Sequence, residues 1–141
     1  MRRALALAAA ALVCVACASA PAPAAPRGPA AGTARLGQTV DVGEFRVTPT
    51  ALVEDSRCPA DAMCVQQGTL RVRATVAGPG GRSEHVFDLS RPLLARDRWL
   101  ALAAGCPYPL ASQPKPPTAY RFVFTVDDTD VTPAPDGYDC D

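Results

Sequence analysis

The sequence predicts a single all-β domain, an antiparallel sandwich or barrel with proline-rich loops and two disulfides. Apolar and polar residues alternate over several short segments, which is typical of strands with one buried face. Prolines and glycines separate these segments and mark irregular connections. Of the six cysteines, all but Cys14 and Cys17 fall in this region, and such an even set in an exported chain indicates disulfides.

The N-terminus is typical of a secretion signal over residues 1–16. Arg2 and Arg3 precede an uncharged apolar run over 4–16. This run has the length of a signal-peptide core and is shorter than the roughly 20 residues that span a bilayer. We therefore exclude it from the predicted fold.

The end of this run, Cys14 to Cys17, resembles a bacterial lipobox. The resemblance implies that Cys17 is lipidated after cleavage behind Ala16, although Cys14 stands where the motif usually has Leu. Ala18 after the cysteine, by the same resemblance, favours the outer membrane. The alternative is ordinary secretion, with cleavage after Ala18 or Ala20, to the periplasm or beyond.

Residues 17–33 are predicted to be a lipidated cysteine followed by a tether. The segment consists largely of Ala, Pro and Gly, whose prolines prevent a helix and whose side chains cannot form a core. The all-β domain is then expected over 34–141, a size for which cross-links help stability.

Strands are expected in order along this domain. A short one is predicted within 36–42, a second over 45–53 with a bend at Pro49, and a hairpin over 69–90. A clear strand covers 120–126. The inward faces are predicted to be Phe45, Val47, Ala51 and Val53; Leu70, Val72, Ala74 and Val76; His85, Phe87 and Leu89; Tyr120, Phe122, Phe124 and Val126.

The segment 92–104 allows two interpretations. Its Leu and Ala content favours a helix with Arg96, Asp97 and Arg98 on an exposed face. A strand from about Arg98, preceded by a turn, is the alternative that we favour. The total is five or six strands, which indicates a sandwich or a barrel.

The four remaining cysteines allow three pairings, of which we predict Cys58–Cys64 and Cys106–Cys140. The first closes a short loop and the second ties the C-terminus to the domain. On the chain-entropy model these bonds stabilise by about 2 and about 4 kcal/mol. A zinc site is not expected, because the chain has no Cys-x-x-Cys pair.

The most distinctive stretch runs from Asp55 through Ser56 and Arg57 to Cys58-Pro59. Asp55 and Ser56 can accept backbone N–H groups in a turn, and Arg57 can brace a carboxylate or loop carbonyls. The stretch is therefore an architectural corner, or a rigid loop that a partner recognises.

This Asp-Ser-Arg-Cys-Pro stretch, followed by Cys64 and Gly68, resembles a motif of small uncharacterised bacterial envelope lipoproteins. The Pro107-Tyr108-Pro109 turn and the strand after Tyr120 also resemble that group, so the likeness covers roughly 36–127. Gln66-Gln67 departs from the Trp and small residue common there, and the Cys106 and Cys140 pair is not typical of it. The resemblance implies an envelope lipoprotein but no activity.

Catalytic and metal sites find little support. His85 is the chain's one histidine, and Ser83, two residues away on a strand, is expected about 7 Å off, too far for a dyad. Asp88 is near only in sequence. A calcium site at the acidic C-terminus is a weak alternative to a solvated tail, with carboxylates from Asp136, Asp139 and Asp141.

The function predicted is therefore a non-enzymatic binding or structural module of the bacterial cell envelope. Expected partners are the membrane, through the anchor, and an envelope protein or small ligand. Without Arg2 and Arg3 the chain is slightly acidic and has no basic patch, so nucleic acid is not expected. No cofactor is expected. The alternatives are a secreted inhibitor acting through the 58–64 loop and a small hydrolase using His85.

Overall fold

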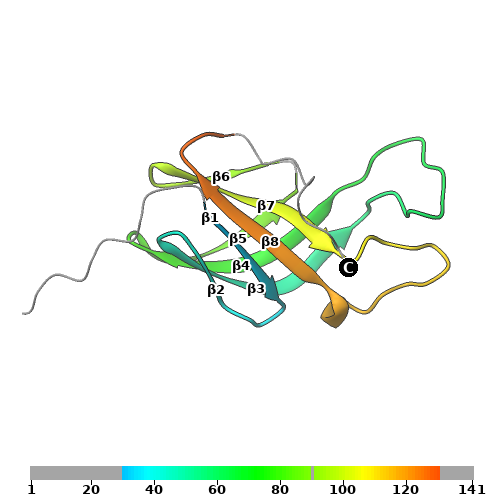
Figure 1. The fold of residues 1–141 in the computed structure, drawn as a ribbon, viewed down its shortest axis with the longest axis horizontal. Coiled ribbons are helices and arrows are strands. Elements are labelled where there is room, and N and C mark those ends of the chain that lie inside the picture. The colour runs from blue at the N-terminus through cyan, green and yellow to red at the C-terminus, as the bar shows by residue number, and fades with distance from the viewer. Residues whose placement is uncertain (1–29, 90, 131–141) are drawn as a thin grey trace, which may run out of the picture.

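The chain forms a β-sandwich of two four-stranded antiparallel sheets that do not close into a barrel. The computed structural model describes residues 30–89 and 91–130. Sheet A has the order β1-β8-β7-β6 and sheet B the order β2-β3-β4-β5 (Figure 1). The strands are β1 (Ala30–Arg35), β2 (Val40–Val42), β3 (Phe45–Asp55), β4 (Leu70–Gly78), β5 (Gly81–Asp88), β6 (Leu93–Ala95), β7 (Arg98–Cys106) and β8 (Arg121–Asp127).

The predicted all-β class is confirmed, and the sandwich replaces the open choice between sandwich and barrel. Residues 30–89 and 91–130 form eight strands instead of five or six, because the short β1 and β6 lack a long alternating pattern. The helix considered for 92–104 does not form, and the favoured strand from Arg98 does. Within the described ranges the helical structure is a single 3₁₀ turn, η1 (Pro117–Ala119).

The first strand begins inside the segment predicted to be a tether. β1 starts at Ala30 and pairs with β8, with Ala30 opposite Val126. Small residues gave no strand pattern, but they suit this site: a Cβ on Gly32 would lie 2.6 Å from the Val40 side chain. Tertiary contact with β2 therefore selects a composition that in isolation indicates a linker.

The predicted strand over 36–42 is shortened to β2, because the chain turns at Gly37. This glycine has a φ of 78°, and its N–H donates to the Pro49 carbonyl at 2.7 Å. The residues before Val40 thus form the connection from β1 to β2.

The inward face predicted for β3 is wrong beyond Pro49. Register shifts lie between Pro49 and Ala51 and between Leu52 and Glu54. Each bulge inserts a residue, so the alternation reverses. As a result Val53 is exposed and Leu52 packs against the core.

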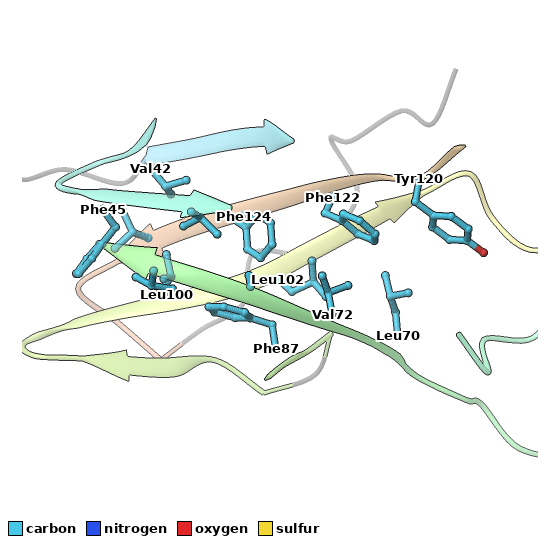
Figure 2. Packing of buried hydrophobic residues seen from close by; sticks show 14 residues of the cluster. Val42, Phe45, Leu70, Val72, Phe87, Leu100, Leu102, Tyr120, Phe122 and Phe124 are labelled. Carbon is cyan, nitrogen blue, oxygen red and sulfur yellow. The ribbon is translucent and has the colours of Figure 1, made fainter. Parts of the chain in front are cut away.

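The core lies between the sheets and consists of apolar side chains from both (Figure 2). Phe87 of sheet B and Phe124 of sheet A meet edge to face at its centre, with ring centroids 5.3 Å apart. Tyr120 lies at one end of the cluster, with its hydroxyl directed away from the apolar side chains (Figure 2). The inward faces predicted for the hairpin and for 120–126 are confirmed at their fully buried positions: Leu70, Val72, Ala74, Phe87, Phe122, Phe124 and Val126.

Arg98 is buried rather than exposed, contrary to its place in the helical interpretation. Its guanidinium lies 2.8 Å from Asp128 and 3.5 Å from Glu44. A buried cation requires such partners, and neither carboxylate is near Arg98 in sequence.

In the part of the chain that the structure describes, no helical segment has the length and apolar character needed to cross a bilayer.

Candidate recognition loop

Two long loops project from the same end of the sandwich (Figure 1). The first, residues 56–69, connects β3 to β4, and the second, residues 107–120, connects β7 to β8. We call residues 58–67 of the first the 58–67 loop. All the distinctive residues of the Asp-Ser-Arg-Cys-Pro stretch lie at its base.

The predicted Cys58–Cys64 disulfide is present and closes residues 58–64 of this loop into a ring, with Cα atoms 5.8 Å apart. It is compatible with a protein of the periplasm or the extracellular space. Cys106 ends β7 and is buried, but Cys140 lies outside the described residues. The second pairing therefore stays a prediction.

Arg57 fixes the base of the loop through a buried ion pair. Its Nε and Nη2 donate to the two carboxylate oxygens of Asp55, each at 2.8 Å. Only 8% of the Arg57 side chain and 7% of the Asp55 side chain are exposed. This two-pronged contact is the strongest arrangement of the two groups and fixes the angle between them.

The same guanidinium reaches the second loop. Arg57 Nη1 donates to the carbonyl of Gly105, and Nη2 donates to that of Pro107 at 3.1 Å. The guanidinium also lies 5.1 Å from the centre of the Tyr108 ring. Arg57 thus braces both the carboxylate and the loop carbonyls, as expected from its donors.

Tyr120 completes the cluster, a contact that the sequence did not indicate. Its hydroxyl donates to Asp55 Oδ2 at 2.7 Å. Burial alone would raise the pKa of Asp55, but hydrogen bonds from Arg57 and Tyr120 and the charge of Arg57 together hold it below 3.8. A buried tyrosine needs a partner for its hydroxyl, which is the one signal that could have found this link.

The phenol of Tyr120 should ionise only in strong alkali. Its pKa is raised to about 12, chiefly by burial. The hydrogen bond to Asp55 and the negative charge of Asp55 act in the same direction. The folded state therefore keeps this proton where the unfolded chain loses it, and stability falls as pH rises from about 10 towards 12. Subtracting the ultraviolet titration of Tyr120→Phe from that of the native protein should give a midpoint near pH 12. A midpoint near 10 would contradict the buried contact.

Ser56 and Gly68 hold the two ends of the loop together. Ser56 Oγ accepts the N–H of Thr69 at 3.0 Å, and the Ser56 N–H donates to the Thr69 carbonyl at 2.8 Å. A Cβ on Gly68 would overlap the carbonyl oxygen of Ser56, so the glycine permits this close approach. Pro59 then starts the exposed segment, where the Ala62 N–H donates to its carbonyl at 3.1 Å.

Asp61 ties the exposed part of the 58–67 loop to the second loop. Its carboxylate accepts the N–H of Ala111 at 2.7 Å, the N–H of Ser112 at 3.1 Å and the Ser112 hydroxyl at 2.7 Å. The N–H of Ala60 donates to the Pro109 carbonyl at 3.0 Å. Sequence reasoning missed this link, because its two halves are fifty residues apart and neither forms a local motif.

The link between the loops should loosen in acid. The hydroxyl of Ser112, followed by the backbone N–H groups of Ala111 and Ser112, lowers the pKa of Asp61 to about 2. A lowered folded-state pKa means that the contribution is complete above about pH 4 and is lost as pH falls through about 2. In an NMR titration the amides of Ala111 and Ser112 should shift together with a midpoint near 2. In Asp61→Ala this transition should be absent, and a midpoint near 4 in the native protein would show that the link does not form.

The tip of the 58–67 loop presents two apolar side chains to solvent. Met63 and Val65 are 101% and 103% exposed, and Tyr108 on the second loop is 52% exposed. The backbone around them is held by a disulfide, a buried ion pair and the Asp61 link. The arrangement is a braced loop whose apolar tip is exposed to solvent.

The histidine lies elsewhere, half-buried on β5, an edge strand of sheet B. Ser83 Oγ and His85 Nε2 are 2.7 Å apart, so the expectation that they lie too far apart for a dyad is wrong. The 7 Å spacing applies to Cα atoms, and both side chains lean along β5 towards each other. Asp88, on the opposite face of β5, accepts the Thr69 hydroxyl at 2.9 Å.

The remaining predicted site residues lie outside the described residues. These are Cys17, the predicted lipid attachment site, and the weak calcium candidates Asp136, Asp139 and Asp141. Among the residues that the structure describes, no group of three or more His, Cys, Asp or Glu side chains is arranged to hold a metal ion.

Comparison of this chain with protein-family models, with curated proteins and with solved structures finds no match.

Proposed function

We propose that this protein is a non-enzymatic binding module of the bacterial cell envelope, and that the 58–67 loop contacts a partner protein. The observation that carries the proposal is the full exposure of Met63 and Val65 on a loop that is otherwise fixed. Single exposed apolar residues are common on protein surfaces. Met63 and Val65 differ from such residues because the loop that carries them is held by three separate restraints.

The energetics favour such a loop as a binding surface. Burying a Met or Val side chain contributes roughly 1.5–3 kcal/mol each. A flexible loop would lose much of this gain in the entropy of ordering, whereas a loop already held by Arg57, Asp61 and a disulfide loses little. Tyr108, stacked beside Arg57, adds an aromatic side chain of the type enriched at interfaces.

A protein partner suits this surface better than a small molecule. Met63 and Val65 are fully exposed at the tip, whereas small ligands are bound in concave sites that bury most of their surface. A protruding loop fits into a groove of another protein, as inhibitor loops do. In our first candidate the partner is a structural protein of the envelope. In the inhibitor alternative the partner is an enzyme that the loop inhibits.

The envelope location rests on the N-terminal sequence. The lipobox-like Cys14 to Cys17, the tether after it and the resemblance to envelope lipoproteins all support a lipid anchor at Cys17. The intact mass of the protein extracted from membranes tests this directly. A lipid-bearing N-terminal Cys17, with a four-proton gain on reduction, is expected. A lipid-free chain starting at Ser19 or Pro21 would indicate secretion and favour the inhibitor alternative.

Site-specific photo-crosslinking tests the loop. A photoreactive amino acid at position 63 or 65 should give a discrete adduct in the cells that produce the protein. The matched control is position 94, since Leu94 is also exposed but lies on β6, away from the loops. The same adducts at all three positions, or none at 63 and 65, would contradict the proposal.

A second candidate, a small hydrolase using His85, is favoured by the 2.7 Å contact between Ser83 Oγ and His85 Nε2. This is the distance of a nucleophile from its base. The hydrolase candidate lacks a third catalytic group, because no carboxylate within residues 30–89 and 91–130 forms a hydrogen bond with the imidazole. Ser83→Ala and His85→Ala should each abolish any hydrolysis of a p-nitrophenyl ester, with Ser112→Ala as the control. Activity that survives in His85→Ala would eliminate this candidate.

A further inference from the structure

A cavity of about 240 Å³ opens between the sheets where the edge strands β5 and β6 approach each other. It lies beside the turns that join β4 to β5 and β6 to β7, at the end of the sandwich away from the two long loops (Figure 1). Its apolar lining comes from Phe45, Val76, Leu93 and Ala95. The cavity therefore opens from the side of the sandwich onto the edge of the hydrophobic core.

Polar groups line the other side of this cavity. Ser83 and His85 line the cavity from the same side of β5 as the core residue Phe87. Their hydrogen bond to each other uses Nε2, and imidazole Nδ1 has no hydrogen-bond partner among the described residues. A polar pair at the edge of a core can orient a ligand that enters it.

Two arginines, Arg82 and Arg96, also line the cavity. The ion pairs within residues 30–89 and 91–130 involve Arg46, Arg57, Arg71, Arg73 and Arg98, but neither of these two. A guanidinium presents a rigid fork of donors that matches a carboxylate. Arg82 and Arg96 lie at the same opening and have no anionic partners there among the described residues. Together they form a rim suited to binding an anion.

Arg96 occupies a backbone position that disfavours it. It is the first residue of the two-residue turn between β6 and β7 and has a φ of 62°. Such turns normally use Asn or Gly, because side chains with a Cβ are strained there. Its side chain extends over the neighbouring turn, where a Cβ on Gly80 would lie 3.2 Å from Arg96 Nε. The strained residue thus brings its guanidinium to the cavity.

We propose that this cavity binds a small organic carboxylate with an apolar body. The body enters between Phe45, Val76 and Leu93, and the carboxylate contacts Arg82 and Arg96. At about 30 Å³ for each atom the size of a water, the cavity accommodates roughly eight non-hydrogen atoms. This site is separate from the 58–67 loop, and it does not depend on catalysis by Ser83.

Hexanoate, with eight non-hydrogen atoms, is the probe. Adding it to the ¹⁵N-labelled protein should shift the amides of Gly80, Gly81 and Ala95 and saturate with a Kd on the order of 1 mM. Hexan-1-ol and hexylamine have the same chain without the negative charge, and should bind at least about ten-fold more weakly. Equal binding of hexanoate and hexan-1-ol would overturn the anionic recognition.

Substitution of the rim completes the test. The double variant Arg82→Gln/Arg96→Gln should weaken hexanoate at least about ten-fold. Arg35→Gln is the matched control, because Arg35 is likewise exposed and forms no ion pair with the described residues, but lies on β1, at the edge of sheet A opposite to β6. Both arginines of the double variant are exposed, so the amides of the core should keep their positions. Unchanged hexanoate binding in the double variant, or the absence of any saturable shift in the native protein, would overturn the proposal.

Discussion

Arg57→Ala should lower the free energy of unfolding by about 3–5 kcal/mol, the cost of breaking a buried ion pair. Asp55 is almost fully buried and would lose both guanidinium contacts, and the carbonyls of Gly105 and Pro107 would lose their donors. Arg71→Ala is the matched control. Arg71 pairs with Glu54 at 3.6 Å with both side chains more than 40% exposed, so its loss should cost about 0–1 kcal/mol.

Urea denaturation of the two variants measures this difference. Arg57→Lys should retain only part of the stability, because an ammonium cannot form the two-pronged contact with Asp55 and reach two carbonyls as well. Equal losses in Arg57→Ala and Arg71→Ala would show that the cluster does not hold the loop base.

The acid dependence of stability should change in the same variant. The pKa of Asp55 is below 3.8 in the native protein, so its contribution is complete above that value and is lost as pH falls through the folded-state pKa. Without Arg57, burial dominates and acts to raise the pKa of Asp55. The stabilising effect of raising the pH through this range should therefore shrink or reverse in Arg57→Ala.

Phe124→Ala should also lower the free energy of unfolding by about 3–5 kcal/mol, through lost burial and the cavity that it leaves. Phe124 is fully buried and meets Phe87 of the other sheet edge to face. Leu94→Ala, at an exposed position on β6, is the control and should stay within about 0.5 kcal/mol of the native protein. Denaturant titration measures both variants.

A double-mutant cycle isolates the contact between the sheets. The coupling between Phe87→Leu and Phe124→Leu should be about 0.5–1.5 kcal/mol, as for other aromatic pairs. A coupling near zero, or a small effect of Phe124→Ala, would mean that the sheets do not pack through this pair.

The sequence was a good guide wherever strands follow the two-residue alternation without interruption. β4, β5 and β8 do so, and their inward faces were predicted correctly. The prediction failed at β3, because two bulges change which side chains of this strand face the core, and no residue type in the sequence indicates a bulge. It failed at β1 because pairing with β8, rather than local composition, determines the place of this strand.

The same division applies to the candidate site. The turn of Asp55, the brace of Arg57 and the short disulfide are local features, and residue chemistry alone indicated them. The contributions of Tyr120 and Asp61 arise from chain segments about 50 to 65 residues away. Local patterns carry no information on such contacts. The Ser83–His85 contact was missed for a different reason, since Cα spacing was used where side-chain direction decides.

The proposed role of the 58–67 loop requires that the loop be ordered although Met63 and Val65 at its tip are fully exposed. Backbone ¹⁵N relaxation of the native protein tests it most directly. We expect order parameters near 0.85 for residues 58–67, as in the strands, with a decrease in Asp61→Ala. Values below about 0.6 across the loop of the native protein would mean that Met63 and Val65 are carried on a flexible segment. That result would contradict both the loop's order and its proposed role in binding.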